Sequence, residues 1–486
     1  MTPEQKRSTT EAIADLRTVS SSGSEPHDAN SFRDMMEAGG IANGFIDWGT
    51  GDVTGYSADG LASINALAKS YRPEGSQRSH QTSNATLAQV IAAAVATAWR
   101  TRHDRTPVEA DFNGLHATIE SWFFGLTQKR LHAVPCVLVD YQVPPFAIGP
   151  VHFYHVTDFP HDQFGVAREE FWPEAANDAP QHEIGGLNFG SLIQMANERC
   201  AAWMAVVEVS GRAEKESIAI ADIAVDIALG ALQVAAPGLH IENITRATAC
   251  LPLRWRADVW AQNDQTRHSI SNHQVARGIH PATFAHVTGT EVAQQLSVMG
   301  GRLAGYLGST SAVPLLDEAW CNAVYWFHEA IAETLDTVAV VKLETAIEVL
   351  FRAEDMKGSK NRIKSSFEAL FGLKESDILP GSSLTVEKFV LNITTARSRV
   401  VHGTWPTIHT DLPGYRKQQP ISRSDLQAIA SILLIHIAHH IEAYLTAGET
   451  NDDTDALLSW IKTQPQAAAP ASPQAPAAPP PTGGEL

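Results

Sequence analysis

From Pro314 onwards the sequence becomes a succession of amphipathic helical segments, and this run constrains the fold more than any other feature. Apolar residues recur with the spacing of an α-helix in five stretches, which are Leu315–Asp336, Val338–Met356, Ser359–Phe371, Leu384–Val401 and Arg423–Thr446. Helices that each have one apolar face pack together to bury it. The sequence therefore predicts an all-α helical bundle over residues 311–448.

The fourth predicted helix has a charged residue on its apolar face. At about 100° per residue from Val386, one apolar stripe contains Phe389, Val390, Ile393, Ala396 and Val400. Arg397 lies near the middle of that stripe, whereas Arg399 lies on the opposite side. A guanidinium on a buried face is costly unless it is paired or faces a cleft or a partner.

A histidine follows where this helix should end. Gly403 suits a left-handed C-terminal cap and Pro406 comes soon after it, so His402 is expected at the helix terminus. A helix C-terminus favours the protonated imidazole. A fixed cation near a titratable acid or base suits a phosphodiester substrate. Ser398 lies between the two residues and is a candidate hydrogen-bonding group in the same cleft.

The Arg397-x4-His402 spacing and two earlier stretches together resemble the HEPN superfamily, and most closely its Apea-like branch. The supporting stretches are AWCNAVYWFHEA (Ala319–Ala330), VVKLETAIEVLF (Val340–Phe351) and ARSRVVHGTW (Ala396–Trp405), in the expected order. The resemblance covers residues 314–445 of the 486. Ser398 departs from the family pattern, in which Asn, Asp or His is commoner at that position.

The resemblance implies a metal-independent endoribonuclease that needs no cofactor. Two such helices would meet across a homodimer formed through the helical domain. His402 would act on the ribose 2′-OH or the leaving 5′-oxygen, and Arg397 would stabilise the scissile phosphate, giving 2′,3′-cyclic phosphate products. The family also implies a defence or toxin effector. The alternative is a non-catalytic HEPN-like module that binds RNA, a nucleotide or a protein partner.

An acidic residue in the second predicted helix is a natural partner for Arg397. Glu344 lies at the edge of the apolar face that Val340, Leu343 and Ile347 form. A buried acid and a buried base in neighbouring helices tend to pair. We therefore expect Glu344 to pair with Arg397 or to orient it. A purely structural ion pair is the other interpretation.

A short basic strip provides candidate contacts to RNA. The segment KGSKNRIK contains Lys357, Lys360, Arg362 and Lys364 and no acidic residue. The chain as a whole carries a formal net charge of −18, which argues against an ordinary nucleic-acid coat protein. A local basic strip can still steer a phosphate chain. The alternative is a solvated helix start.

The remainder of the chain predicts an α+β N-terminal domain before the helical bundle. Residues 1–82 are polar and expected to be partly disordered, and residues 83–310 alternate helical segments with short strands in an α+β domain of unknown role. Residues 449–486 read as an acidic connector with a short helix-like stretch, DALLSWIKTQ, followed by a disordered Pro/Ala-rich tail. From the charge asymmetry, the acidic N-terminal part is expected to sense an unknown trigger or to restrain the cleft.

The cysteines and the apolar segments indicate a cytoplasmic protein without a membrane partner. The four cysteines are scattered, and the N-terminus lacks the apolar stretch of a signal peptide. The apolar segments Leu87–Trp99, Ser217–Ala236 and Leu426–Leu445 read as core helices, because the first is short and the others contain charged residues or histidines.

Two groups of histidines are candidate metal sites. One group is His152, His155, Asp158, His161 and Asp162, and the other is His436, His439 and His440. The first begins in a predicted strand, where residues three apart point to opposite faces, and the second has no accompanying carboxylates. We expect no metal at either group. The sequence also lacks a nucleophile elbow, a Walker loop and a kinase signature.

Overall fold

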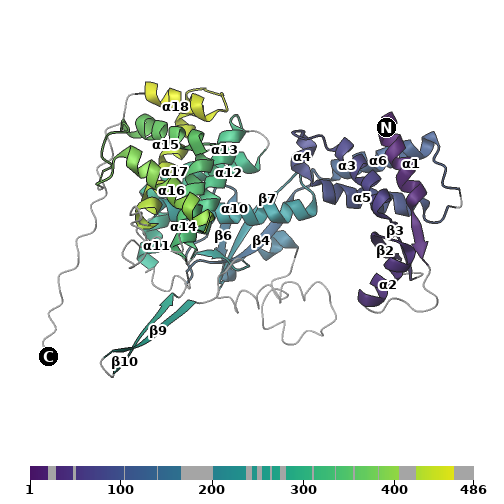
Figure 1. Cartoon of the computed structure of the whole chain (residues 1–486), viewed down its shortest axis with the longest axis horizontal. Helices are drawn as coiled ribbons and strands as arrows, with labels where there is room; N and C mark the ends of the chain where they lie inside the picture. Colours follow the sequence, from purple (N-terminus) through teal and green to yellow (C-terminus); the bar gives the residue numbers. More distant parts are fainter. Residues whose placement is uncertain are drawn as a thin grey trace. The chain divides into compact units, whose positions relative to one another are not determined.

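The structure, a computed structural model, is a mixed α and β protein in which helices predominate, in agreement with the coarse fold class expected (Figure 1). It describes residues 1–19, 29–47, 51–102, 104–139, 141–165, 201–236, 244–248, 254–262, 265–273, 281–308, 311–333, 335–353, 356–380, 383–403 and 423–464. The chain forms two compact units. The first comprises Met1–His132 and Glu208–Ala221, and the second comprises Ala133–Val207 and Asp222–Leu486.

The first unit combines helices with a small antiparallel sheet. In chain order its elements are α1 (Pro3–Asp15), β1 (Arg17–Val19), α2 (Ala29–Gly39), β2 (Asn43–Asp47), β3 (Asp52–Tyr56), α3 (Ala58–Tyr71), α4 (Gln77–Gln81), α5 (Asn84–Trp99) and α6 (Glu109–Gly125). The strand order is β1-β3-β2. A capping box between Thr2 and Gln5 starts α1, and the Ser83 hydroxyl caps α5.

Helices on both sides of residue 82 share one hydrophobic core in this unit. Ile91 and Val95 of α5 are buried in the same cluster as Ile13 of α1 and Leu67 of α3. The expected division into residues 1–82 and 83–310 therefore does not coincide with the compact units. Because residues 1–82 are polar in overall composition, the apolar faces of α1 and α3 were not predicted. These faces are buried in one core together with residues of α5 and α6.

The second unit contains a five-stranded sheet. Its order is β5-β6-β7-β4-β8, with β4 (Arg130–Val137), β5 (Phe146–Ile148), β6 (Val151–His155), β7 (Trp203–Val209) and β8 (Thr245–Arg246). Trp203 is fully buried, and its indole donates a hydrogen bond of 2.9 Å to the Val139 carbonyl. The long apolar helix α10 (Glu214–Ala235) follows β7, as the sequence predicts.

Two further strands form a separate sheet. β9 (Arg254–Gln262) pairs antiparallel with β10 (Gln265–His273), and each strand has nine residues. The sequence predicts β9 but not β10, whose residues are mostly polar. Figure 1 shows the two strands as a hairpin. The short helix α11 (Pro281–Thr288) comes next along the chain.

The C-terminal part of the second unit is helical, and all five helices predicted there are present. They are α13 (Pro314–Ile331), α14 (Asp336–Leu350), α15 (Met356–Phe371), α16 (Val386–Val401) and α17 (Arg423–Thr446). A further helix, α12 (Thr290–Leu307), packs against α13 and α17. Arg302 of α12 bonds Asp317 at 2.9 Å and Glu442 at 2.6 Å. The helical assembly thus begins before the expected boundary at residue 311.

Adjacent glycines in α12 explain why that helix was not predicted. Glycine lowers helix propensity, and α12 contains the pair Gly300 and Gly301. A Cβ atom on Gly300 would lie 2.3 Å from the backbone nitrogen of Gly149, which links β5 and β6 with a φ of 57°. The close approach of helix and sheet therefore requires glycine at position 300.

The last described helix also belongs to the helical assembly. α18 (Thr454–Thr463) packs against α15 and α17, with the rings of Trp460 and Tyr444 5.3 Å apart. Lys462 forms a 2.6 Å ion pair with Glu368 of α15. This helix coincides with the short helix-like stretch DALLSWIKTQ that the sequence predicts within the segment 449–486. The Pro/Ala-rich tail itself lies outside the described residues.

Two described helices are long and apolar enough to cross a membrane by length and composition alone. They are α10 and α17, in which 72% and 44% of the most apolar window is buried within the protein. Core helices pass the same test, so this finding is weak evidence for a membrane span. The burial of α10 agrees with its expected role as a core helix.

Candidate functional site

The helix α16 places Arg397 on its inward side. The Thr385 hydroxyl accepts a hydrogen bond of 3.3 Å from the Lys388 backbone and so caps the first turn. The residues buried along the helix include Phe389, Val390, Ile393 and Ala396. Arg397 lies on this side of the helix, and Arg399 is exposed. The helical periodicity read from the sequence is therefore correct for these residues.

Two glutamates of α14 hold the Arg397 guanidinium. Arg397 Nε lies 3.1 Å from Glu344 Oε2, and Arg397 Nη1 lies 2.8 Å from Glu348 Oε2. The Glu344 side chain is fully buried, the Glu348 side chain is 11% exposed, and the Arg397 side chain is 39% exposed. The pair expected between Arg397 and Glu344 is present. Arg397 is therefore held by α14 on its inner side, while part of its side chain remains exposed to solvent.

The protonation of Glu344 is unusual for a carboxyl group. Burial and, to a smaller extent, the neighbouring Glu348 raise its pKa, the Arg397 charge lowers it, and the net result is a pKa of about 8. Among the described residues, neither carboxyl oxygen of Glu344 has a hydrogen bond of regular geometry. Glu344 therefore interacts with Arg397 through charge, and it takes up or releases a proton near neutral pH.

His402 stands at the end of the same helix and faces solvent. It is the C-cap residue, its backbone N–H donates a 3.0 Å hydrogen bond to the Ser398 carbonyl, and Gly403 follows with a φ of 68°. Residues five apart on a helix differ in direction by about 140°. His402 and Arg397 are thus near in sequence but diverge around the helix. A regular helix therefore points the two side chains in different directions, and Ser398 between them is half-buried.

The basic strip is largely occupied by contacts within the protein. Arg362 donates hydrogen bonds to the carbonyls of Phe351 and Arg352 and lies 3.3 Å from Asp455. Lys364 forms a 2.9 Å ion pair with Glu375. These two side chains hold the end of α14 and the loop after α15, so they are poor candidates for RNA contacts.

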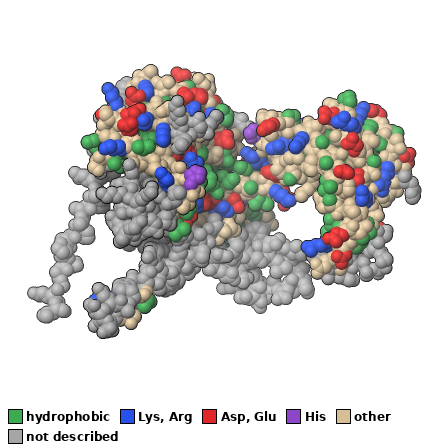
Figure 2. Space-filling view, viewed as in Figure 1, with side chains coloured by type: hydrophobic (Ala, Val, Ile, Leu, Met, Phe, Trp, Pro, Cys, Tyr) green, Lys and Arg blue, Asp and Glu red, His purple; other side chains and the backbone are tan. Residues whose placement is uncertain are grey.

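The remaining two residues of the strip are Lys357 and Lys360. Lys360 is half-buried, and no ion pair with it is found in the described part of the chain. The side chain of Lys357 lies outside the described residues. On the face drawn in Figure 2, basic and acidic side chains are interspersed among the described residues.

Neither histidine group forms a metal site in the described residues. No cluster of three or more His, Cys, Asp or Glu side chains with suitable geometry is found there. His152 is exposed on β6, whereas His155 contacts Thr157 at 2.8 Å and packs edge-on against Trp203. Asp158 accepts a hydrogen bond from Gln142 instead. This group is a set of separate structural and surface contacts.

The histidines of α17 are packing residues. His436 packs edge-on against Phe371 with ring centroids 5.1 Å apart, and it stacks with His440. Burial lowers the pKa of His436, and burial together with the neighbouring histidines lowers the pKa of His440 to about 4. Burial also lowers the pKa of His439. The lowered pKa values favour the neutral form of these three histidines within the helical assembly.

Sequence reasoning missed Glu348, the second acidic partner of Arg397. Glu348 lies four residues after Glu344 and therefore on the same face of α14. That spacing was visible in the sequence and would have predicted a pair of carboxylates facing one arginine. Their mutual repulsion is one cause of the raised pKa of Glu344.

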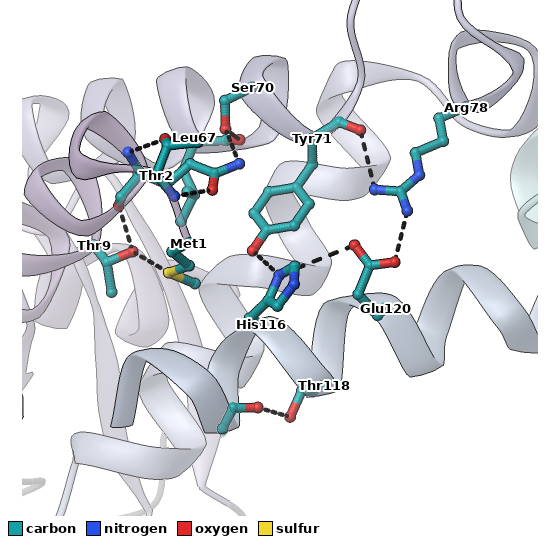
Figure 3. Close-up of polar contacts among 12 residues, drawn as sticks. Met1, Thr2, Thr9, Leu67, Ser70, Tyr71, Arg78, His116, Thr118 and Glu120 are labelled. Carbon is teal, nitrogen blue, oxygen red and sulfur yellow. Dashed lines mark hydrogen bonds and ion pairs between the residues drawn. The ribbon is translucent and has the colours of Figure 1, made fainter. Parts of the chain in front are cut away.

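A polar network in the first unit was also missed. Figure 3 shows Tyr71 of α3, Arg78 of α4, and His116 and Glu120 of α6 in contact. The Tyr71 hydroxyl lies 2.7 Å from His116 Nδ1, and Arg78 forms a 2.6 Å ion pair with Glu120. Arg78 also stacks 4.4 Å over the Phe123 ring. The spacing of His116 and Glu120, four residues apart on α6, was the available signal.

Comparisons of the chain with protein-family models, with curated proteins and with solved structures find no match. The resemblance to the HEPN superfamily consequently depends on the residues and motifs of this sequence alone.

Proposed function

We propose that the helical part of this protein is a HEPN-type, metal-independent endoribonuclease. The observation that supports the proposal is the anchored arginine at the end of α16. Arg397 is fixed by Glu344 and Glu348 while 39% of its side chain stays exposed, and no partner of its Nη2 atom is found among the described residues. A preorientated guanidinium with one free edge is suited to bind a phosphate.

The proposed reaction assigns one role to each residue. His402 removes the proton of the ribose 2′-OH or protonates the leaving 5′-oxygen, and Arg397 stabilises the negative charge that develops on the phosphate. The 2′-oxygen forms a bond to phosphorus while the bond from phosphorus to the 5′-oxygen breaks. The products are a 2′,3′-cyclic phosphate and a 5′-hydroxyl. DNA lacks the 2′-OH and would not react.

The divergence of His402 from Arg397 supports a composite site in a homodimer. Because one chain turns the two side chains in different directions, a second copy is proposed to bring its own α16 end against the first. This proposal places the dimer contact at the helical part of the chain. Mass measurement of the purified protein in solution tests it, and a monomer that cleaves RNA would contradict it.

The second candidate is a non-catalytic HEPN-like module that binds RNA, a nucleotide or a protein partner. The carboxylates around Arg397 favour this alternative. The Glu348 carboxylate lies 2.8 Å from Arg397 Nη1, so a phosphate that binds Arg397 must compete with this carboxylate. A binding module would retain RNA affinity without producing cleaved ends.

Analysis of product ends distinguishes the two functions. The wild type is incubated with RNA in EDTA, and the ends are tested for a 2′,3′-cyclic phosphate. Arg397→Ala and Arg399→Ala are compared in parallel, because both remove one arginine of α16 but only Arg397 lies beside the glutamates. The nuclease proposal expects cyclic ends that disappear in Arg397→Ala alone. Binding of RNA without any new ends supports the module.

The biological role is a further proposal, carried by the family resemblance. It places the protein among growth-arresting or antiphage effectors, with the N-terminal part sensing a trigger. Truncation at residue 310 is an unsuitable test, because it removes α12, whose Arg302 bonds Asp317 and Glu442. Growth on expression of the wild type and of His402→Ala is the better comparison. Equal growth after the trigger is supplied would contradict an effector role.

A further inference from the structure

Helix α14 ends on an arginine in the left-handed backbone conformation. Arg352 has a φ of 49°, and it is the only residue other than glycine with a positive φ in the part of the chain that the structure describes. Its backbone N–H donates a 3.0 Å hydrogen bond to the Val349 carbonyl, and the Ala353 N–H donates one of 3.1 Å to the Glu348 carbonyl. These two bonds form a Schellman motif, in which the left-handed residue is usually glycine.

Three neighbouring helices end with glycine instead. Helices α15, α16 and α17 are each followed within two residues by a glycine of positive φ, and these are Gly372, Gly403 and Gly448. A side chain in this conformation carries a steric cost that glycine avoids. Backbone outliers of this kind are concentrated at functional sites, where the surrounding structure holds them in place. The arginine at the end of α14 is therefore a candidate for a function other than ending the helix.

Contacts from α15 fix the backbone of Arg352 and leave its side chain without a partner. Arg362 donates hydrogen bonds to the carbonyls of Phe351 and Arg352, and it lies 3.3 Å from Asp455 of α18. The Arg352 side chain is exposed, and it forms no hydrogen bond or ion pair with any residue in the described ranges. The structure thus holds an unpaired guanidinium at a fixed helix end.

The end of α14 and the end of α16 lie at the same end of the helical assembly. Phe389, near the start of α16, packs against Phe367 in the second half of α15, with ring centroids 6.0 Å apart. Arg362, in the first half of α15, contacts the end of α14. Helix α15 therefore runs back along the assembly, and α16 returns in the direction of α14 (Figure 1). The ion pair between Arg397 and Glu348 joins the late parts of both helices.

Arg352 comes one helical turn after the glutamates that hold Arg397. Nε of Arg397 is beside Glu344 and Nη1 is beside Glu348, so its guanidinium lies along α14 toward the helix end. Arg352 follows Glu348 by four residues, a rise of about 6 Å along a helix. Two ionised carboxylates and one guanidinium have a net negative charge, which disfavours a phosphate. A second guanidinium at the end of α14 balances that charge.

We propose that Arg352 binds the RNA phosphate next to the one that Arg397 stabilises. The inference rests on the nuclease function proposed above, and it assigns to Arg352 the binding of substrate and not the chemical step. A guanidinium binds a phosphate through two parallel hydrogen bonds, and an exposed, unpaired one loses no existing partner when it does so. Arg397 can then remain held by both glutamates while the site accepts an anion.

Binding is measured with the full chain in a His402→Ala background in EDTA, so that the RNA stays intact. The probe is a fluorescein-labelled oligo(U), and affinity is followed by anisotropy at several salt concentrations. Arg352→Gly removes the guanidinium and supplies the residue that the backbone conformation favours, whereas Arg352→Lys keeps the positive charge. Lys388→Ala is the matched control, because it removes an exposed cation from the first turn of α16, at the opposite end of the helix from His402.

The proposal expects Arg352→Gly to weaken binding several-fold and to make the slope of log K against log salt shallower by about 0.7, the value for one phosphate contact on a single strand. Its thermal unfolding temperature should not fall, because glycine adopts the left-handed conformation without steric cost. Arg352→Lys should bind more tightly than Arg352→Gly, and Lys388→Ala should stay within about twofold of the background protein. Unchanged affinity in Arg352→Gly, an equal loss in Lys388→Ala, or a loss of affinity together with a lower unfolding temperature would overturn the proposal.

Cleavage kinetics with His402 present separate this inference from the proposed function. Arg352→Gly should lower kcat/KM several-fold and leave kcat within about twofold, because substrate binding is weakened and the chemical step is retained. Cleavage by the wild type with unchanged kcat/KM in Arg352→Gly retains the nuclease and removes Arg352 from its site. Binding that depends on Arg352 without any cleavage retains the inference and favours the binding module. A wild type that neither binds nor cleaves RNA contradicts both proposals.

Discussion

Arg397 Nε lies 3.1 Å from Oε2 of Glu344, a carboxyl group with no exposed surface. Desolvation makes the ionised form of Glu344 unfavourable, while the guanidinium makes it favourable, and the pKa of about 8 shows that desolvation prevails. The arginine is thus oriented by a neighbour whose charge changes near neutral pH. Arg397 consequently has a defined direction without being fully neutralised by Glu344.

The first prediction concerns stability against pH. The pKa of Glu344 is raised in the folded state, so the folded protein holds this proton more tightly than the unfolded chain does. The stabilising contribution is complete below the ordinary glutamate pKa of 4.5 and is lost as pH rises toward about 8. Glu344→Gln should remove this dependence. Unfolding by denaturant across this pH range measures it, and parallel profiles for both proteins would contradict the assignment.

The second prediction uses the other carboxyl group. Glu348 raises the pKa of Glu344, so Glu348→Gln should lower the pKa of Glu344 and move the pH-dependent loss of stability to lower pH. Glu368→Gln is the control, because Glu368 of α15 forms its ion pair with Lys462 of α18, whereas Arg397 is paired with Glu344 and Glu348. A shift of the same size in the control would show that Glu348 has no specific effect on Glu344.

The third prediction tests the attachment of α12 to the helical assembly. Arg302 is buried between Asp317 and Glu442, so Arg302→Met leaves a buried acid without its partner. We expect a loss of about 3–5 kcal/mol in the free energy of unfolding. Arg399→Met, at an exposed position of α16, should change it by about 0.5 kcal/mol or less. Comparable losses would mean that α12 is not fixed by Arg302.

The fourth prediction concerns the network of Figure 3. Burial raises the pKa of Tyr71 to about 12, so its hydroxyl stays protonated and can donate to His116 Nδ1 at 2.7 Å. A double-mutant cycle with Tyr71→Phe and His116→Ala should give a coupling of about 1 kcal/mol in unfolding free energy. Additive losses would show that the two side chains do not interact in solution.

The parts of this protein that the sequence predicted are those governed by local periodicity. The helix α16 and the inward position of Arg397 follow from a 3.6-residue pattern, and the partner on α14 follows from the cost of burying a charge. The five C-terminal helices were found for the same reason. The direction of His402 was not predicted, because the Arg-x4-His motif defines a spacing along the chain and not an angle around the helix.

Other features depend on contacts between distant segments, which local patterns do not contain. Helix α12 includes a glycine pair that lowers helix propensity, and it is stable because Gly300 allows close contact with Gly149. The shared core of α1, α3, α5 and α6 joins segments on both sides of an apparent change in composition. The strand β10 is polar and becomes recognisable only through its pairing with β9.

The measurement that tests the central claim most directly is RNA cleavage in EDTA by the wild type and by His402→Ala, purified in parallel. His152→Ala is the matched control, because it removes another exposed histidine, which lies on β6. The account predicts fragments with 2′,3′-cyclic phosphate ends from the wild type and from His152→Ala, and none from His402→Ala. Equal cleavage by the wild type and His402→Ala would contradict it.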